Sequence, residues 1–360
     1  MKNEGPFILD WIAHHRAVGV RDFLVYTNDC DDGTVALLDR LAARGALVRR
    51  DNPLGSNKGK TPQHAALIDA ADCAPAVDAE WILPIDVDEY VNIRPGAGTF
   101  ADLLAAAEAL AGAAPEMISL PWRLFGSDGT EGFRDKPVTA QFTRCAAAWR
   151  PKPHQAWGFK TAFRAGVPYA RFGVHRPVKP HDGAAPVWLD GSGRPMPRKF
   201  IGRGWRMDKH CWGYDLVQLN HYAVRSAESF LVKRARGRVN HTSRDQGLQY
   251  WWVMNRNEDE DRSILRLRRA AREEMQALKA DPEVRRLHQA CLRAHRRKIK
   301  ALRADPEHAE LLARLVSPGF DALSRIDGAF GTAWFEEGPP PEAFEPGDGP
   351  ILRAVRGAAP

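Results

Sequence analysis

Long hydrophobic runs are missing from this 360-residue sequence: no stretch approaches the roughly 18 consecutive apolar residues that a membrane-spanning helix needs. The beginning of the chain also lacks the basic, apolar and small-residue segments of a secretory signal. Hydrophobic residues make up 44% of the chain and charged residues 27%, which is ordinary for a soluble globular protein. We therefore expect a cytoplasmic protein with one large domain or two modest ones.

Cysteine is also scarce. The five cysteines are widely scattered and form no Cys-x-x-Cys pair: they are Cys30, Cys73, Cys145, Cys211 and Cys291. An odd and dispersed set is typical of reduced thiols, so the sequence supports neither a disulfide framework nor a structural zinc site.

The net charge of +7 is unevenly distributed, because arginine and lysine crowd the stretch from Arg262 to Arg303. Such a stretch indicates either a solvated helical face or contact with an anionic surface, such as the inner face of a membrane. It has no interleaved aromatic residues and no known binding motif, so we expect no nucleic-acid partner.

The first hundred residues alternate between helical and strand patterns. Helices are expected at 6–18, 34–43 and 61–74, and strands at 23–26, 46–48 and 81–85. This alternation predicts an α/β fold with a mostly parallel central sheet flanked by helices. Ligands of such sheets bind at the carboxyl ends of the strands.

The later part of the chain is less regular. Strands are expected at 117–120 and 141–143, and the pattern becomes helical again after Ala227. Residues 258–335 form a basic helical extension, and 336–360 are so rich in proline and glycine that they are typical of a disordered tail.

Asp86 and Asp88 directly follow the apolar segment 81–85. Residues two apart in extended backbone point to the same side, so the two carboxylates can share one divalent cation. Mg²⁺ and Mn²⁺ prefer oxygen ligands and bridge the phosphates of a nucleotide diphosphate. An acidic turn is the alternative, but a second polar cluster, residues 28–32, ends an earlier strand at the same expected edge.

Four segments together resemble a known family. They are KNEGPFILDWIAHHRAVGV, YTNDCDDGT, WILPIDVDEYV and LNHYAVRSAESFLVKRARG, in this order. They look like the family 2-like glycosyltransferases, close to glycosyltransferase family 92, and the resemblance extends over residues 1–257.

The resemblance implies a GT-A fold at 1–257, with a nucleotide-binding half at 1–115 and an acceptor half at 116–257. It implies a metal-dependent, inverting, hexosyltransferase-like enzyme that moves a sugar from a UDP- or GDP-sugar to a glycan, lipid-linked or protein acceptor. It also implies an apolar strand before Asn3, which this sequence lacks, and we expect that the start of the chain is assigned too far downstream.

Carried onto this sequence, the resemblance implies a nucleotide-sugar site and a site for Mn²⁺ or Mg²⁺. The nucleotide-sugar residues are Asn3, Glu4, Asn28, Asp29, Asp31 and Asp86, and the metal ligands are Asp86, Asp88 and His221. The alternative interpretation of His221 is a histidine buried in the core. Lys58 and Lys60 lie on a glycine-containing loop, where they either pair with the diphosphate or are solvated.

Inverting transfer needs a general base for the acceptor hydroxyl, and a carboxylate is the usual choice. Asp128 and Glu131, in FGSDGTEG, and Asp182, in HDG, are the candidates. Asp128 is favoured because a glycine-flanked loop after a strand can approach a bound sugar, although an ordinary turn fits each of the three. Trp122 is a candidate for stacking on the acceptor sugar, with a core tryptophan as the alternative.

Two other classes of function are open. A nucleotidyltransferase or metal-dependent phosphohydrolase would use the same carboxylates on a phosphoanhydride, although KNEGPF lacks the glycine-rich basic signature that a nucleotidyltransferase needs after its first strand. The third class is a basic protein that binds anionic surfaces through the stretch from Arg262 to Arg303.

Overall fold

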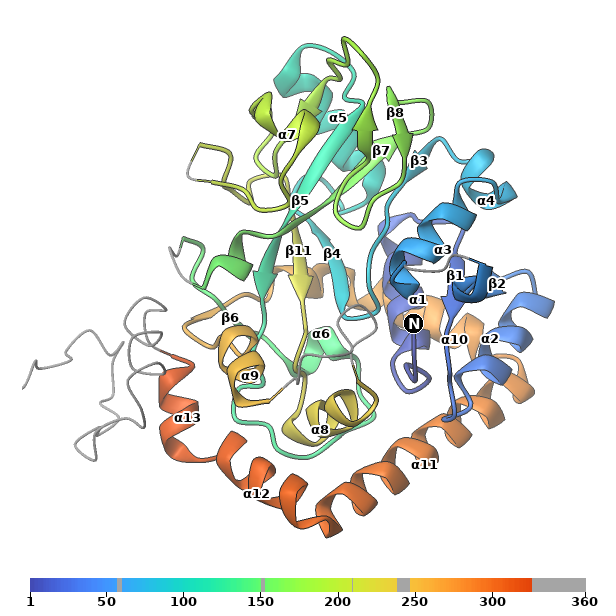
Figure 1. The fold of residues 1–360 in the computed structure, drawn as a ribbon, viewed down its shortest axis with the longest axis vertical. Helices are drawn as coiled ribbons and strands as arrows, with labels where there is room; N and C mark the ends of the chain where they lie inside the picture. Colours follow the sequence, from blue (N-terminus) through green and yellow to red (C-terminus); the bar gives the residue numbers. More distant parts are fainter. Residues whose placement is uncertain (57–59, 150–152, 209, 238–246, 326–360) are drawn as a thin grey trace, which may run out of the picture.

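A computed structural model describes residues 1–56, 60–149, 153–208, 210–237 and 247–325 (Figure 1). The predicted diphosphate contact Lys58 and the predicted tail at 336–360 lie outside the described residues. The described chain is an α/β structure, as the alternating sequence pattern predicts. It has one six-stranded sheet and three two-stranded sheets, which pair β1 (Leu24–Thr27) with β2 (Val48–Asp51), β6 (Arg144–Cys145) with β12 (Asp259–Glu260), and β8 (Tyr169–Arg171) with β9 (Val178–Pro180).

The N-terminal third contains a parallel pair of strands and the helices that connect them. Its elements are α1 (Ile8–Val18), β1 (Leu24–Thr27), α2 (Thr34–Ala43), β2 (Val48–Asp51), η1 (Leu54–Ser56), α3 (Pro62–Ala70) and α4 (Ala74–Val77). Helix α1 ends at Gly19, whose φ of 106° is left-handed and therefore favours glycine. Thr61 caps α3 by accepting a hydrogen bond from the backbone N–H of His64. β1 and β2 pair in parallel, as expected for this part of the chain.

The larger sheet has six strands. They are β3 (Trp81–Ile82), β4 (Glu89–Ile93), β5 (Met117–Leu124), β7 (Phe159–Arg164), β10 (Trp188–Leu189) and β11 (Val217–His221). Their order is β3-β7-β5-β11-β4, with β10 also on β5. Only β5–β11 and β5–β10 are parallel, whereas β3–β7, β5–β7 and β4–β11 are antiparallel. The prediction of a mostly parallel central sheet is therefore wrong, because the sheet is mixed.

Two local features explain why the expected single sheet is not seen. The strand predicted at 81–85 stops at Ile82, and Pro84, two residues later, has no backbone N–H to donate to a neighbouring strand. Among the described residues, β1 and β2 form a sheet of their own and do not pair with β3. The strand expected at 141–143 is also absent: α6 (Val138–Gln141) and the short β6 (Arg144–Cys145) occupy this region.

The remaining described elements all follow β4 in the chain. They are α5 (Phe100–Ala111), η2 (His154–Trp157), β8 (Tyr169–Arg171), β9 (Val178–Pro180), α7 (Lys199–Gly202), α8 (Ala227–Ala235), α9 (Leu248–Met254), β12 (Asp259–Glu260), η3 (Ser263–Leu267), α10 (Arg268–Leu278), α11 (Pro282–Ala304), α12 (Pro306–Leu315) and α13 (Pro318–Leu323).

The C-terminal helices are part of the folded unit. Helix α10 packs along α1, and α11 runs under α2 and α8 (Figure 1). Gly5 must be glycine here, because an added Cβ would lie 2.6 Å from the Cys291 sulfur of α11. All five cysteines are free thiols. In the part of the chain that the structure describes, no helix is both long enough and apolar enough to cross a membrane.

Candidate functional site

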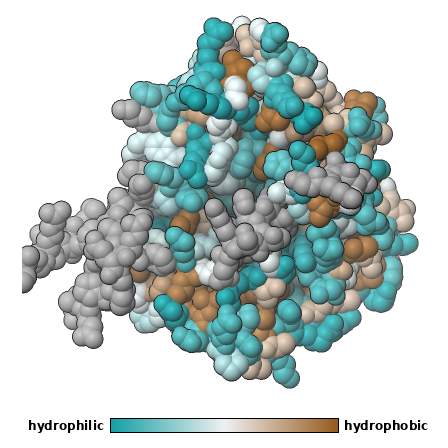
Figure 2. Space-filling view, in the orientation of Figure 1, coloured by the Kyte–Doolittle hydropathy of each residue, from teal (hydrophilic) through white to brown (hydrophobic). Residues whose placement is uncertain are grey.

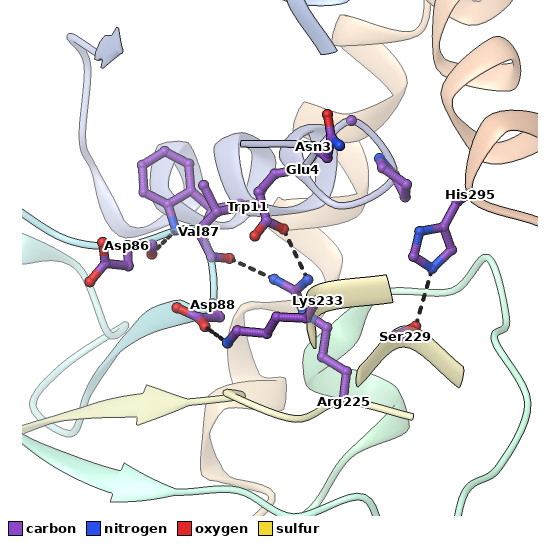
Figure 3. Close-up of polar contacts among 12 residues, drawn as sticks. Asn3, Glu4, Trp11, Asp86, Val87, Asp88, Arg225, Ser229, Lys233 and His295 are labelled. Atoms are coloured by element: carbon purple, nitrogen blue, oxygen red, sulfur yellow. Dashed lines mark hydrogen bonds and ion pairs between the residues drawn. The ribbon is translucent and has the colours of Figure 1, made fainter. Parts of the chain in front are cut away.

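The loop from Asp86 to Glu89, which connects β3 and β4, is held by donors from distant segments (Figure 3). The indole Nε1 of Trp11 donates hydrogen bonds to the carbonyl oxygens of Asp86 and Glu89, at 3.1 Å and 2.9 Å. Arg225 Nη2 donates to the carbonyl of Val87 at 3.2 Å. Three backbone carbonyls of the loop are thus fixed, so the acidic pair is placed on a rigid support.

Glu4 fixes Arg225 in turn. Arg225 Nη1 lies 3.0 Å from Glu4 Oε2, Arg236 pairs with the other oxygen, and the Arg225 guanidinium stacks 3.7 Å from the centre of the Phe7 ring. Burial by itself raises the pKa of Glu4, but Arg236 and Arg225 outweigh it and the pKa is lowered. In this structure the Glu4 carboxylate therefore supports Arg225 through an ion pair.

Positive φ angles are found at Arg225 and at a few other non-glycine residues. Among the described non-glycine residues they occur at Asn3, Asp29, Asp128, Lys179 and Arg225. Asparagine and aspartate tolerate this conformation, whereas an arginine with a φ of 56° is strained unless its surroundings hold it. Strained backbone of this kind is typical of functional sites.

Asp88 is buried and paired with a lysine. Lys233 Nζ, from α8, lies 2.6 Å from Asp88 Oδ2, and His221 Nε2 lies 3.7 Å from Asp88 Oδ1. Burial opposes the charged form of Asp88, but Lys233 and then His221 outweigh it, so the pKa of this carboxyl is well below its usual range. Asp88 is therefore ionised at neutral pH.

Asp86 has a different environment. Its side chain is 49% exposed, and its carboxylate accepts hydrogen bonds from Lys160 Nζ at 3.1 Å and Gln63 Nε2 at 3.2 Å. Lys160, from β7, is buried and also lies 3.6 Å from Glu89 Oε2. Burial raises the pKa of Glu89 to about 7, even though Lys160 lowers it. Glu89 also accepts a hydrogen bond from the backbone N–H of Asp86, at 2.9 Å.

Acidic and basic groups are equal in number in this region. Four acidic groups, Glu4, Asp86, Asp88 and Glu89, face four basic groups, Lys160, Arg225, Lys233 and Arg236. Among the described residues, four buried polar atoms of this region nevertheless have no hydrogen-bond partner: Glu89 Oε1, Trp122 Nε1, His221 Nδ1 and Arg225 Nε. Buried polar atoms are nearly always paired, so these four indicate a place for a ligand or ordered water.

Trp122 forms an aromatic floor beside His221. Its ring centre lies 4.6 Å from that of His221 and 5.5 Å from that of His175, which in turn stacks on Trp205 at 4.8 Å. An added Cβ at Gly158 would lie 2.3 Å from Trp122, so a glycine is required there. Trp122 is 8% exposed, and its predicted role in acceptor stacking stays a prediction.

The ends of β1, β2 and β3 meet at one cavity of about 610 Å³. Its polar end is lined by Asn28, Asn52, Gln63 and Asp86, which follow these strands or begin the next helix. Asn28 Nδ2 donates to Asp29 Oδ2 at 3.0 Å. Of the two expected polar clusters, Asn28 and Asp86 line this cavity, whereas Asp29, Asp31 and Asp88 are not among its lining residues.

Asn3 orders the loop after β1. Its Nδ2 donates to Asp31 Oδ1 at 2.6 Å, and its Oδ1 accepts from the backbone N–H of Asp31 at 2.9 Å. Lys60 is exposed. The pairing of Asn3 with Asp31 ties the first residues of the chain to the loop after β1. Nucleotide contacts by Asn3, Asp31 and Lys60 stay predictions.

The three predicted bases have other partners or are exposed. Asp128 Oδ1 accepts from Arg325 at 3.0 Å, Glu131 pairs with Arg303 at 3.0 Å, and Asp182 is exposed in the turn after β9. Within the described ranges, none of them has a hydrogen bond or ion pair with Asp86 or Asp88.

The predicted metal site is incomplete as it stands. No group of three or more His, Cys, Asp or Glu side chains in the described ranges is arranged to hold a metal ion. Asp88 and His221 are neighbours and suit Mn²⁺ by donor type, but Asp86 is turned toward Lys160 and Gln63. A cation at Asp88 also requires that Lys233 first move away from it.

Sequence reasoning missed Glu89, Lys160, Arg225 and Lys233. Glu89 stands directly after the acidic pair in DVDEY. Arg225 and Lys233 lie within the motif LNHYAVRSAESFLVKRARG, so these three residues had a local signal in the sequence. Lys160 had none, because only the antiparallel pairing of β7 with β3 and β5 brings it to Asp86.

Comparisons with known proteins match the N-terminal part of the chain. Residues 3–111 match the sequence model of the family described as Glycosyltransferase family 92. This supports a glycosyltransferase and confirms the resemblance in the part of the chain that holds Asn3, Asn28, Asp86 and Asp88.

Two curated relatives carry the same family description. A glycosyltransferase family 92 protein of Oryza sativa subsp. japonica is 30% identical over 105 residues, which are 29% of this chain and 17% of the relative. A glycosyltransferase family 92 protein of Ricinus communis is 27% identical over 97 residues, which are 27% of this chain and 16% of the relative. The matched region thus spans less than a fifth of each relative, and no solved structure matches the chain significantly.

Proposed function

We propose that this chain is a GT-A-type glycosyltransferase that takes a UDP- or GDP-sugar as donor and inverts the anomeric carbon on transfer. The acceptor is a glycan, a lipid-linked molecule or a protein. The observation that carries this proposal is the convergence of Asn28, Asn52 and Asp86 at the polar end of one cavity. Strand ends of an α/β protein that meet in this way are where a nucleotide binds.

The basic groups of the site suit the leaving group. Departure of a nucleoside diphosphate leaves negative charge on phosphate oxygens, and preorganised cations stabilise such charge. Lys233 lies on α8 and pairs with Asp88. Arg236 lies directly after α8 and pairs with Glu4. In the proposed reaction these two side chains exchange part of their pairing with carboxylates for pairing with the diphosphate.

A divalent cation, Mn²⁺ or Mg²⁺, is proposed to bind through Asp88 and His221, with Asp86 as the third ligand. When bound, it would neutralise charge on the diphosphate. The chain's own contribution is to hold Asp88 ionised beside His221, whose Nδ1 has no hydrogen-bond partner among the described residues.

For the general base, Asp128, Glu131 and Asp182 stay the candidates. Asp128 follows the end of β5, and β5 pairs with β11 so that Leu124 lies opposite His221. The Asp128 loop therefore leaves the sheet at the edge where His221 lies. The base takes the proton of the acceptor hydroxyl as the hydroxyl oxygen attacks the anomeric carbon and the diphosphate leaves.

The test is calorimetric titration of the protein with UDP and with GDP, in the presence and absence of Mn²⁺. The Asp86→Asn and Asp88→Asn variants are compared with Asp72→Asn, an exposed aspartate outside the site. We expect metal-dependent binding of one nucleotide by the parent and by Asp72→Asn, and loss of binding in the other two.

Binding is followed by product analysis with the matching nucleotide sugar. Release of the nucleoside diphosphate together with a glycosylated acceptor supports transfer, whereas cleavage of the phosphoanhydride points to the phosphohydrolase class. Absence of nucleotide binding by a folded parent chain, under every metal condition, contradicts the proposal.

The basic face of α11 suits contact with the anionic inner surface of a membrane, where a cytoplasmic enzyme would meet a lipid-linked acceptor. Arg293, Arg297, Lys298 and Lys300 are exposed on this helix. Figure 2 shows a face of the molecule that is mostly hydrophilic with smaller hydrophobic patches. We propose this contact as an accessory to the glycosyltransferase.

A further inference from the structure

Three tryptophans from distant segments of the chain pack against one another. The ring centres of Trp149 and Trp157 are 5.0 Å apart, those of Trp157 and Trp212 are 5.2 Å apart, and those of Trp149 and Trp212 are 6.2 Å apart. The indole Nε1 of Trp212 donates to the carbonyl of Ala148 at 2.6 Å, which fixes this ring beside the segment that carries Trp149. We call Trp149, Trp157 and Trp212 the tryptophan cluster.

The tryptophan cluster is not closed off from solvent. Trp149 is 50% exposed, and Trp157 and Trp212 are half-buried. Apolar surface left in water costs about 25 cal/mol per Å², so large aromatic side chains are usually buried for most of their area. Single exposed apolar residues are common, but several aromatic rings that meet at the surface are typical of a binding site.

The tryptophan cluster is continuous with the candidate site. Gly158, directly after η2, accepts a hydrogen bond from the backbone N–H of Trp122 at 2.8 Å and packs against the Trp122 ring. Tyr214, whose ring centre lies 5.1 Å from that of Trp212, donates from its hydroxyl to the carbonyl of Trp122 at 2.9 Å. Trp122 contacts His221, and their strands, β5 and β11, lie side by side (Figure 1). The aromatic surface therefore leads from solvent to the site.

Arginine side chains border the aromatic rings. Arg194 donates from Nη2 to the carbonyl of Trp212 and is half-exposed. The exposed Arg206 places its guanidinium 4.2 Å from the ring centre of Trp205, which lies 6.0 Å from that of Trp122. Guanidinium donors beside aromatic faces suit a ligand with C–H groups on its face and hydroxyl oxygens at its edge. A pyranose ring has this distribution, whereas an aliphatic chain has no acceptors for the arginines.

We propose that the tryptophan cluster is a subsite for the acceptor, and that the acceptor is a chain of pyranose rings. The inference rests on the proposed function, because it assigns the chain to the acceptor of the transfer. The ring that receives the sugar lies near Trp122, and a ring farther along the chain stacks on Trp149. An oligosaccharide that reaches both tryptophans buries more aromatic surface than a single ring, so its affinity should increase with its length.

The test uses the 360-residue chain and β-linked oligosaccharides of glucose, mannose, galactose, xylose and N-acetylglucosamine, each beside its monosaccharide. Binding is measured without nucleotide, by calorimetry and by quenching of tryptophan fluorescence. Trp149→Ala removes the exposed ring, and Trp149→Phe keeps a ring at the same place. The control is Val77→Ala, because Val77 is an apolar side chain that is 61% exposed on α4, outside the cluster.

We expect at least one oligosaccharide to bind the parent and Val77→Ala equally and more tightly than its monosaccharide. Trp149→Ala should weaken this binding by roughly three- to tenfold, Trp149→Phe should keep most of it, and the affinity for nucleotide should not change.

Failure of every oligosaccharide to bind a parent that binds nucleotide overturns the subsite and leaves the proposed function standing. Equal oligosaccharide binding by the parent and Trp149→Ala also overturns it, because the sugar is then held elsewhere. If the parent is a dimer and Trp149→Ala a monomer, a second copy covers the cluster and the subsite is overturned. Oligosaccharide binding that depends on Trp149, in a chain that binds no nucleotide, supports the sugar site and contradicts the proposed function.

Discussion

Lys233 Nζ lies 2.6 Å from Asp88 Oδ2, and the side chains are only 16% and 12% exposed. The two residues are far apart in the chain: Asp88 follows β3, whereas Lys233 belongs to α8. This ion pair links the acidic motif to the helix that follows His221, and it decides whether Asp88 is free to take another cation.

The Lys233→Met variant should lose roughly 3–5 kcal/mol of unfolding free energy, because Asp88 would stay buried without its partner. Urea unfolding measures this loss. The Asp88→Asn, Lys233→Met double variant should recover part of it, because no buried charge is left unpaired. If Asp88 is a metal ligand, Mn²⁺ should raise the unfolding midpoint of the single variant more than that of the double variant. If Lys233→Met loses only as much unfolding free energy as the removal of an exposed ion pair costs, the result contradicts this account.

Glu89 should make stability depend on pH. Burial raises its pKa from the ordinary value of 4.5 to about 7, so the folded state binds a proton more tightly than the unfolded state. The stabilisation of the folded state by protonated Glu89 is fully present below pH 4.5 and is lost as the pH rises through about 7. Glu89→Gln should remove this loss, which amounts to at most about 3 kcal/mol.

Thermal unfolding from pH 4 to pH 8 measures the effect of Glu89→Gln. The control is Glu80→Gln, because Glu80 is 73% exposed in its pair with Arg164. Parallel pH profiles for the parent and Glu89→Gln would show that Glu89 is not the group that titrates.

Gly158→Ala should disturb the aromatic floor. The added Cβ would lie 2.3 Å from Trp122, and Trp122 contacts His221, so the rings must shift. We expect a loss of about 1–3 kcal/mol of unfolding free energy and weaker nucleotide binding. Gly202→Ala is the control, because nothing lies within 4 Å of its added Cβ. Equal stability and equal binding in the two variants would exclude a steric role of Gly158.

Exposed basic residues of α11 should carry any binding to anionic membranes. The Arg293→Gln, Arg297→Gln, Lys300→Gln triple variant should lose flotation with anionic liposomes while keeping its unfolding midpoint, since these side chains are exposed. Truncation at residue 259 is a poorer experiment, because it removes helices that pack on α1 and α2.

The control for membrane binding neutralises three exposed basic residues elsewhere, Lys136, Arg171 and Arg198. Binding should also fall as salt rises from low to physiological concentration, because surface charges are screened. Equal flotation of both triple variants would remove the membrane contact from the proposed function.

Local features were predictable from the sequence. Thr34–Ala43 is the predicted helix, α1 ends at the predicted Gly19, and Asp86 and Asp88 follow an apolar segment as expected. Helical periodicity, capping residues and strand-end acids act over a few neighbouring residues, so they are visible in one dimension.

Only the tertiary structure decided the strand directions and the partners of the acidic residues. The antiparallel placement of β7 brings Lys160 to Asp86, and the packing of α8 brings Lys233 to Asp88. It also decided that the pKa of Glu89 is raised, because burial depends on segments far away in sequence. Pairing and desolvation are set by such long-range contacts, and the sequence carries no local pattern for them.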